Sequence, residues 1–280
     1  MRPLPIEHIQ NLLAEFETEG QKNPQPPVQS RIPTCGLPHY SYKNANSIVD
    51  GKPVRKGEIP WQVGLVEKYS SFGRSFESWF CGGTVINEKW ILTAAHCLED
   101  AKLSSLHVAI GHLYRHDFRI SDADRKLGKA MIKAKRIIIH ENYNKNTLKN
   151  DIGLIELDKS INFPTGRNKD KSLVIPACLP TREFMKSISY DEDPSNSKPP
   201  TLCKVTGWGE TENTVNYGEN EKQLRAAEVP LMKNDVCRNY MAEDQKYADL
   251  SYGNVCAGDQ NINSGKFDQV FGEKISLNYL

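Results

Sequence analysis

A histidine at the end of an apolar run is the first group in this sequence that could do chemistry. His96 follows Ala94 and Ala95 and precedes Cys97, after a run rich in β-branched residues. This pattern predicts a strand that leads into a tight turn. Imidazole changes its protonation state near neutral pH, so His96 could accept and return a proton. The alternative is a packed histidine beside a structural thiol.

Two cysteines bracket this segment. Cys81 lies sixteen residues before Cys97 and is followed by Gly82 and Gly83. A disulfide between the two cysteines would clamp the loop that carries His96. Such a bridge would stabilise the fold by on the order of 3 kcal/mol, because it lowers the entropy of the unfolded chain.

An aspartate stands fifty-five residues after His96, immediately before an apolar run. Asp151 precedes Ile152–Leu157, where it could lie half-buried at the start of a strand. A carboxylate in contact with a base histidine holds it in one tautomer and stabilises its imidazolium. Taken alone, an aspartate at such a position is usually a turn former.

Four segments together resemble the chymotrypsin/trypsin family of serine endopeptidases. They are Trp90-Ile91-Leu92-Thr93-Ala94-Ala95-His96-Cys97, Asn150-Asp151-Ile152-Gly153-Leu154, Cys203-Lys204-Val205-Thr206-Gly207-Trp208-Gly209 and Cys256-Ala257-Gly258. The resemblance implies an all-β fold of two six-stranded antiparallel barrels. It also implies that His96 is the catalytic base and that Asp151 orients it.

Composition narrows the classes of partner and the compartment. The 280 residues carry 36 basic and 35 acidic side chains, so nucleic acid and anionic membrane are not expected partners. No apolar segment approaches the roughly 18 residues that cross a bilayer. Seven cysteines favour an oxidising compartment and therefore a secreted protein, although the N-terminus shows no signal-peptide core.

The local pattern predicts both strands and loops. Leu106–Ile110, Lys135–His140 and Ile152–Leu157 are the clearest strand candidates, and their spacing suits a closed antiparallel barrel. We expect Glu67–Ser78 and Arg115–Lys129 to be polar surface loops.

The resemblance divides the chain into a pro-segment with a Pro-rich linker, residues 1–47, and a protease-like domain, residues 48–280. Within the domain, we expect the first barrel over 48–170 and an incomplete second barrel over 171–280. Ser47 and Ile48 resemble the activation junction, but Ser47 stands where a trypsin-like activator needs a basic residue. Either a protease of different preference cuts there, or nothing does and Ile48 merely begins the first strand.

The resemblance also implies a disulfide pattern. The pairs it implies are Cys35–Cys178, Cys81–Cys97 and Cys237–Cys256. Cys203 is then left over, and an odd thiol in an oxidising compartment suggests that a partner segment is missing.

The family's nucleophile motif is absent from this sequence. After Cys256-Ala257-Gly258 the family has a glycine-rich loop with an aspartate before the nucleophilic serine. Ser264 precedes one glycine but lacks that context, and Asp268 only weakly resembles the floor of a specificity pocket. We therefore expect the resemblance to stop near Lys266, with a truncated second barrel and no activity in the chain as written.

By lineage, then, the sequence predicts a secreted, trypsin-like serine endopeptidase zymogen that needs no cofactor and no metal. Its expected partners are protein or peptide substrates, with an activating protease or an inhibitor. The alternative is a non-enzymatic protease-like binding or decoy protein that modulates a proteolytic cascade. A further alternative is that the tail comes from a different or misread exon and that the full gene product is active.

Overall fold

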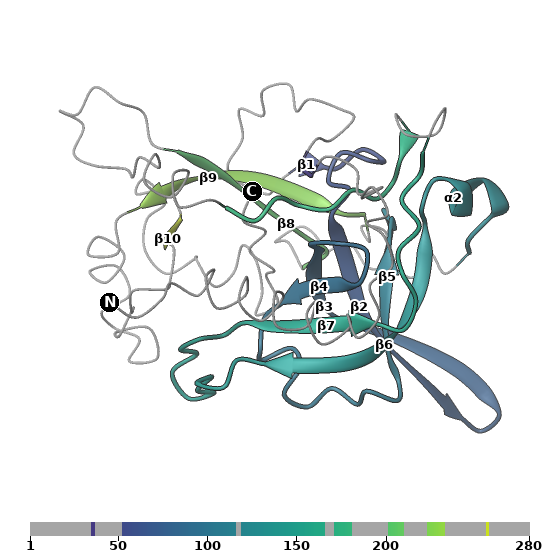
Figure 1. Ribbon diagram of the computed structural model, residues 1–280, viewed down its shortest axis with the longest axis horizontal. Coiled ribbons are helices and arrows are strands. Elements are labelled where there is room, and N and C mark those ends of the chain that lie inside the picture. The colour runs from purple at the N-terminus through teal and green to yellow at the C-terminus, as the bar shows by residue number, and fades with distance from the viewer. Residues whose placement is uncertain are drawn as a thin grey trace, which may run out of the picture.

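Six antiparallel strands close into a barrel in the first half of the chain (Figure 1). The structure is a computed structural model, and it describes residues 35–36, 52–115, 119–165, 171–180, 201–209, 223–232 and 256–257. Around the barrel the strands follow the order β2-β3-β4-β7-β6-β5, so each has two neighbours. Their bounds are β2 (Gln62–Ser71), β3 (Arg74–Val85), β4 (Trp90–Thr93), β5 (Leu106–Ile110), β6 (Ala130–Ile139) and β7 (Gly153–Leu157).

The remaining described strands form a four-stranded sheet centred on β9. This sheet contains β1 (Lys52–Pro53), β8 (Leu202–Gly207), β9 (Arg225–Met232) and β10 (Cys256–Ala257). The all-β fold class predicted from the sequence is confirmed. In the described residues, one barrel closes, and the four strands of this sheet do not form another. The second barrel over 171–280 stays a prediction.

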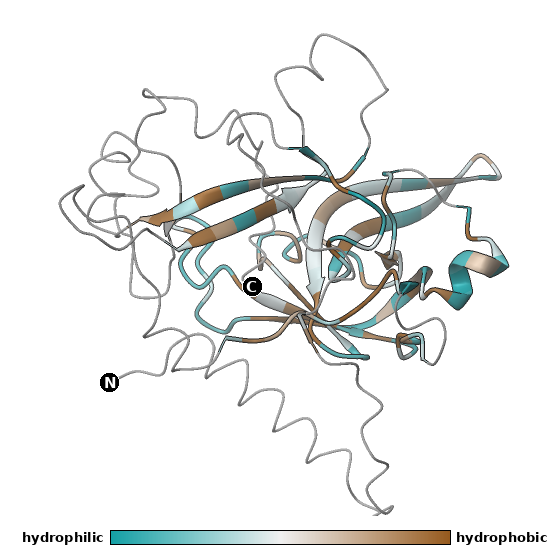
Figure 2. Ribbon diagram, turned by 90° about the horizontal axis from the view of Figure 1, so that it is seen from above, coloured by the Kyte–Doolittle hydropathy of each residue, from teal (hydrophilic) through white to brown (hydrophobic). Residues whose placement is uncertain are grey.

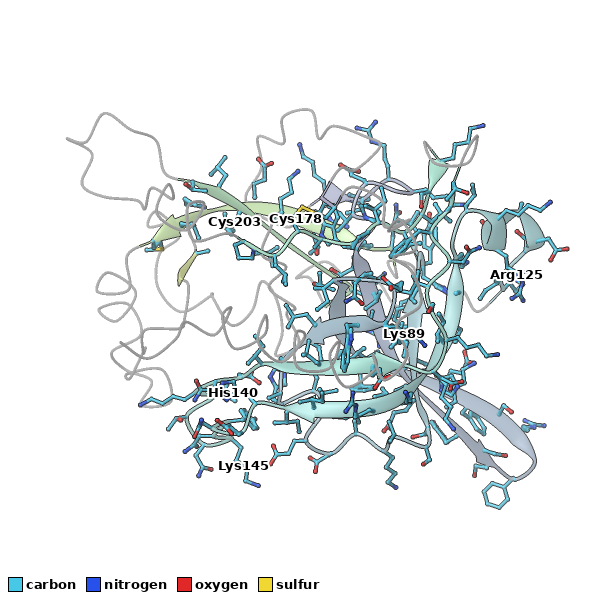
Figure 3. All side chains as sticks on the ribbon, viewed as in Figure 1. Lys89, Arg125, His140, Lys145, Cys178 and Cys203 are labelled. Carbon is cyan, nitrogen blue, oxygen red and sulfur yellow. A yellow bond between two sulfur atoms is a disulfide. The ribbon has the colours of Figure 1, made fainter. Side chains whose placement is uncertain are left out.

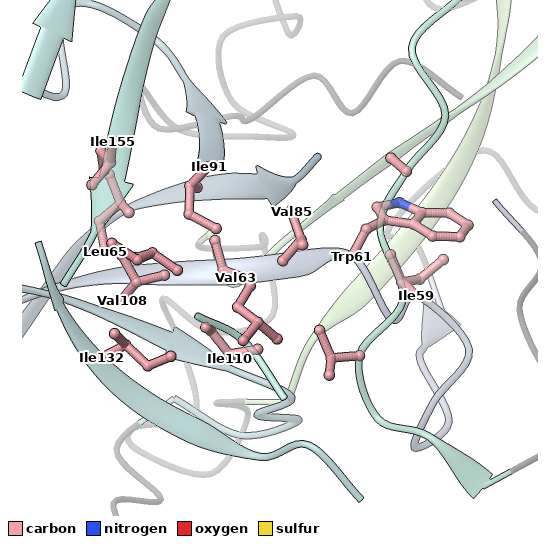
Figure 4. Close-up of a cluster of buried hydrophobic side chains, with 14 of the residues drawn as sticks. Ile59, Trp61, Val63, Leu65, Val85, Ile91, Val108, Ile110, Ile132 and Ile155 are labelled. Carbon is pink, nitrogen blue, oxygen red and sulfur yellow. The ribbon is translucent and has the colours of Figure 1, made fainter. Parts of the chain in front are cut away.

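The interior of the barrel is filled by alternate residues of its strands. Along β5, Leu106, Val108 and Ile110 are fully buried, and Val63 and Leu65 of β2 meet them. Figure 4 shows Val63, Leu65, Val108 and Ile110 in this buried cluster, where they lie on the paired strands β2 and β5. Burial of each such side chain contributes about 1.5–3 kcal/mol, so the period-two pattern both predicts the strands and stabilises the closed barrel.

The predicted strands are found where the apolar alternation is strongest. Leu106–Ile110 coincides with β5, and the two other predicted segments overlap β6 and β7. The run before His96 is divided between the end of β3 and β4. The turn between them is held by the Asn87 side chain, whose Oδ1 accepts from the backbone N–H groups of Lys89 and Trp90, both at 2.8 Å.

The prediction of a loop over Glu67–Ser78 is wrong. Strands β2 and β3 continue through this segment as a hairpin that turns at Phe72 and Gly73. Cross-strand pairs explain the extension: the rings of Tyr69 and Phe76 stack 5.5 Å apart.

The second predicted loop, Arg115–Lys129, contains a short helix, α2 (Asp122–Lys126). The Ser121 side chain caps it by accepting from the backbone N–H of Asp124 at 3.1 Å. Lys56 Nζ donates to Asp124 Oδ1 at 2.8 Å. This helix buries none of its residues and is hydrophilic except at Ala123 (Figure 2).

A glycine on β2 makes room for a tryptophan that joins the two halves of the chain. A Cβ at Gly64 would overlap the six-membered ring of Trp79. Trp79 is buried on the outside of the barrel, and its ring meets the ring of Trp208 edge-to-face at 5.2 Å. Gly64 therefore lets Trp79 lie flat across β2 and pack against the segment that follows β8.

We predict that Gly64→Ala destabilises the fold by about 1–3 kcal/mol, because the added methyl group displaces a buried ring. Thermal or urea unfolding measures this cost. Gly207→Ala is the matched strand control, since its Cβ would meet no heavy atom closer than 3.9 Å. Equal stabilities for the two variants would show that the close approach of Trp79 is not needed.

Candidate active site

His96 sits in a tight turn directly after β4. The carbonyl of Ala95 accepts hydrogen bonds from the backbone N–H groups of Leu98 and Glu99, at 2.9 and 3.1 Å. The Thr93 hydroxyl donates to the carbonyl of Gly82 at 2.8 Å and so ties the end of β4 to β3. The fully buried Ala95 has no bulk beyond its methyl group, which allows the turn to curl against the barrel.

A disulfide closes the same turn from the other side. Cys81 of β3 and Cys97 are bonded at an S–S distance of 2.03 Å. Because this bond ties the residue after His96 to β3, the backbone at His96 is fixed by the barrel wall as well as by its own hydrogen bonds.

Barrel topology brings Asp151 to the same edge. Strands β4 and β7 are antiparallel neighbours, and Thr93 lies opposite Gly153. The chain leaving β4 and the chain entering β7 therefore meet at one end of the barrel. His96 comes three residues after Thr93 and Asp151 two residues before Gly153, so the register alone places both side chains together.

The resulting geometry is a two-point contact between a carboxylate and a histidine. Asp151 Oδ2 lies 2.6 Å from His96 Nδ1, and Asp151 Oδ1 accepts from the backbone N–H of His96 at 2.8 Å. An ionised carboxylate is only an acceptor, so Nδ1 carries the proton and Nε2 keeps its lone pair. In this tautomer His96 presents a base at Nε2.

Strained backbone positions precede the aspartate. Leu148 and Asn150 have φ values of +51° and +55°. Asparagine tolerates this region, whereas a leucine rarely occupies it. The side chain of Asn150 donates to the carbonyl of Asn142 at 2.8 Å, which holds the bend that delivers Asp151. Sequence reasoning missed this feature, although an asparagine before the aspartate was a signal for it.

The glycine that follows the aspartate motif permits close packing beneath the site. A Cβ at Gly153 would lie 2.6 Å from Leu98 Cδ1 and 3.1 Å from the carbonyl oxygen of Ile138. A larger residue would push β7 away from the histidine turn. Gly153 therefore contributes to the short distance between His96 and Asp151.

The pair is partly open to solvent on the histidine side. The side chains of His96 and Asp151 are 31% and 19% exposed. The negative charge of Asp151 reaches Tyr143: burial, followed by the charges of Asp151 and Glu99, raises the pKa of the tyrosine above its ordinary value.

The sulfur atoms beside His96 are not available as metal ligands. Cys81 Sγ, Cys97 Sγ and a ring nitrogen of His96 lie within 4.8 Å of one another, and Cys97 Sγ is 3.5 Å from Nε2. Metals bind the thiolate form of cysteine, and both sulfurs are joined in the disulfide. The cluster therefore supports no metal role while that bridge is intact.

The other residues predicted for the site are only partly described. Cys35 and Cys178 are joined by a disulfide, and the backbone N–H of Gly36 donates to the carbonyl of Pro176 at 2.9 Å. Five predicted positions and one side chain lie outside the described residues. They are Ser47, Ile48, Cys237, Ser264, Asp268 and the side chain of Cys256.

Cys203 forms no disulfide with the other cysteines that the structure describes. It lies on β8, opposite Val229 of β9 (Figure 3). Its side chain is half-buried, and burial raises the pKa of its thiol. The thiol is therefore mostly neutral at physiological pH.

The Trypsin family matches residues 48–266 of this chain, a span that contains the closed barrel and the His96–Asp151 pair. The chain therefore belongs to the trypsin family of serine proteases. It is 30% identical over 241 residues to mannan-binding lectin serine protease 1 of Mus musculus. It is 29% identical over 252 residues to clotting factor C of Tachypleus tridentatus, and 31% identical over 229 residues to ovochymase of Halocynthia roretzi.

These similarities cover most of this chain and a minority of each relative. They span 82%, 87% and 81% of the chain, but 29%, 22% and 12% of the respective relatives. The chain thus matches only part of the length of these larger proteins. Among the residues that the structure describes, no helix is long and apolar enough to cross a membrane.

We predict that Cys203 is alkylated more slowly at pH 7.5 than a small unperturbed thiol. As the pH is raised, its alkylation rate should continue to increase above pH 8.5, the ordinary pKa of cysteine being about 8.5. A raised pKa leaves less thiolate at neutral pH, which gives this direction. Iodoacetamide labelling followed by peptide mapping measures it, with Cys203→Ser as the control. A Cys203–Cys237 or Cys203–Cys256 bridge in the map would contradict the assignment of a free thiol.

Proposed function

We propose that this protein is, by lineage, a secreted serine endopeptidase of the zymogen type. The observation that carries the proposal is the pair of contacts between the Asp151 carboxylate and His96, at 2.6 and 2.8 Å. These contacts fix the tautomer and the orientation that a general base requires. Membership of the trypsin family supplies the reaction class.

In a chain that carries the family's nucleophile, His96 Nε2 would take the proton from the serine hydroxyl as that oxygen attacks a peptide carbonyl. Nε2 would then return the proton to the leaving amine. Asp151 stays ionised and stabilises the imidazolium between the two transfers. Its second contact, with the backbone N–H of His96, keeps the ring from turning away during the cycle.

The nucleophile is the missing part of this apparatus. No Gly-Asp-Ser-Gly segment occurs in the 280 residues. We therefore propose that the chain as written holds the base and its orienting carboxylate but has no hydroxyl for them to activate.

We predict no covalent labelling of the 280-residue chain by a fluorophosphonate and no hydrolysis of peptide amides, before or after cleavage between Ser47 and Ile48. Loss of a single oxyanion-hole donor alone costs roughly 10²–10³ in rate, and the segment that supplies these donors in the family is not recognisable here. Gel fluorescence and intact mass measure labelling. Stoichiometric labelling would show that Ser264 or another serine serves as nucleophile.

A chimaera tests whether the described pair is competent. Residues 267–280 are replaced by a segment that carries the family's Gly-Asp-Ser-Gly-Gly-Pro motif and the residues that follow it in a trypsin-family protease. We expect this chimaera to react with fluorophosphonate after activation. His96→Ala and Asp151→Asn should each lower its rate by at least about 10³–10⁴, because the base is lost or held in the wrong tautomer. An unreactive, folded chimaera would count against the proposed role of the pair.

The organisation of the chain follows from the same proposal. We infer that residues 1–47 form a pro-segment, that the Ser47–Ile48 bond is the activation junction, and that the Cys35–Cys178 disulfide retains the pro-segment after cleavage. Proteins or peptides would be the substrates, and an activating protease or an inhibitor would be the regulatory partner. Disulfides in the described residues agree with an oxidising, extracellular compartment.

A further inference from the structure

The hairpin of β2 and β3 projects well beyond the barrel (Figure 1). Strand β2 pairs with β5 only as far as Glu67, and β3 pairs with β4 only at Thr84 and Val85. In the described part of the chain, residues 68–77 therefore pair with no third strand, and the backbone N–H of Lys68 donates to the carbonyl of Ser105 at 3.0 Å. Neither face of this two-stranded ribbon is therefore flanked by another strand of the described residues.

Three aromatic side chains are exposed on this short ribbon. Phe72 at the turn is 103% exposed, and the stacked pair of Tyr69 and Phe76 is 51% and 42% exposed. Single exposed apolar residues are ordinary, but three within eight residues of one ribbon are a concentration of the kind that marks interaction sites. We call these three residues the hairpin patch.

Phe72, at the turn of the hairpin, has a backbone conformation that phenylalanine rarely adopts. Phe72 and Gly73 have φ values of +49° and +72°, as the two central residues of a type I′ turn require. Asparagine, aspartate or glycine suits the first of these positions, whereas a bulky residue there is an outlier. The fully exposed ring of Phe72 does not compensate for this strain within the hairpin. A partner that binds the ring would account for a phenylalanine at this position.

Charge defines the chemistry of the occupant. Lys68 and Glu77 pair with each other at 2.7 Å on the ribbon. Arg74 is then the only charged side chain between residues 69 and 76. The occupant that fits is apolar with acidic flanks.

The size of the patch favours a tethered occupant over a separate protein. A stable interface between separate proteins buries roughly 800 Å² on each partner. An aromatic side chain offers about 150–250 Å² when wholly exposed, and two of the three here are already half-covered. A segment of the same chain needs much less, because tethering raises its effective concentration to the millimolar range.

The chain contains a segment of the required kind ahead of Cys35. Residues 1–20 carry apolar side chains at helical spacing, namely Ile6, Ile9, Leu12, Leu13 and Phe16. The same residues include four glutamates, Glu7, Glu15, Glu17 and Glu19, against the single arginine Arg2. An apolar stripe with acidic flanks complements the aromatic patch and Arg74.

The tether is long enough for this contact. Cys35 is fixed to Cys178 by a disulfide, and eighteen residues, or nineteen Cα-to-Cα steps, lie between it and Phe16. Fully extended, that length spans at most about 65 Å. A domain of this size has a radius of gyration near 19 Å, so the segment can reach the hairpin from Cys35.

We propose that the hairpin patch is the docking site for the chain's own N-terminal segment, residues 6–16, which binds Tyr69, Phe72 and Phe76 with its apolar side and Arg74 with its glutamates. The hairpin thereby retains the segment on the first barrel, away from the His96–Asp151 pair. This contact does not depend on catalysis.

Photocrosslinking in the full chain tests the contact directly. Phe72 is replaced by p-benzoylphenylalanine, and the crosslinked peptides are identified by mass spectrometry. We expect crosslinks within one chain to residues 6–16. The same probe at Leu103, which is 40% exposed outside the hairpin, should give none to that segment. Crosslinks from position 72 only to a second copy, or to no residue of 1–20, would overturn the proposal.

Hydrogen exchange gives an independent measurement with a variant that should fold well. Phe72→Asn suits the type I′ turn and removes the ring, so the thermal stability of the barrel should be unchanged or higher. We expect exchange of the backbone amides in residues 6–16 to become about tenfold faster in this variant. Leu103→Asn should leave their exchange unchanged. Equal exchange of residues 6–16 in the parent chain and Phe72→Asn would refute the docking.

Discussion

The described site depends on one carboxylate that makes two contacts with the same residue. Asp151 Oδ2 meets the imidazole of His96, and Oδ1 accepts from its backbone N–H. The second contact fixes the position of the main chain, and the first fixes the ring. Because both oxygens bind one residue, the histidine turn cannot shift relative to β7 without loss of the imidazole contact. Other features around the site serve to bring the carboxylate to this place.

Barrel closure supplies that placement. Strand β7 is held between β4 and β6, with Gly153 opposite both Thr93 and Ile139. A slip by one residue in the β4–β7 register would turn the apolar side chains of Ile155 and Leu157 out of the core. The hydrophobic interior therefore specifies the register, and the register specifies the distance between His96 and Asp151. Folding energy and site geometry depend on the same residues.

Sequence reasoning succeeded where side-chain pattern determines structure. Alternation in Leu106–Ile110 predicted a strand because one face of that strand is fully buried. It failed over Glu67–Ser78, where neither face packs on the core and the strands depend on cross-strand pairs such as Tyr69 with Phe76. The helix α2 was missed although Ser121 and Asp124 stand at capping positions. The family resemblance identified the candidate site. The left-handed backbone at Leu148 could not be predicted, because leucine has no preference for that conformation.

The closed barrel builds the His96–Asp151 pair, and the sheet around β9 packs against this barrel. The His96–Asp151 pair is built from residues between Cys81 and Gly153, all on or beside the closed barrel. The sheet around β9 joins this barrel through discrete contacts: Thr206 donates to Gln62 at 2.7 Å in a buried position, and Trp208 Nε1 donates to the carbonyl of Leu113 at 3.1 Å. The two halves also share one hydrophobic cluster, in which Leu224 and Ala226 pack with the buried residues of the barrel. A first barrel that closes on itself can keep a base correctly oriented whatever happens to the segment that would supply the nucleophile. The fold can therefore hold the His96–Asp151 pair in the geometry for proton transfer even in a chain that lacks the nucleophile.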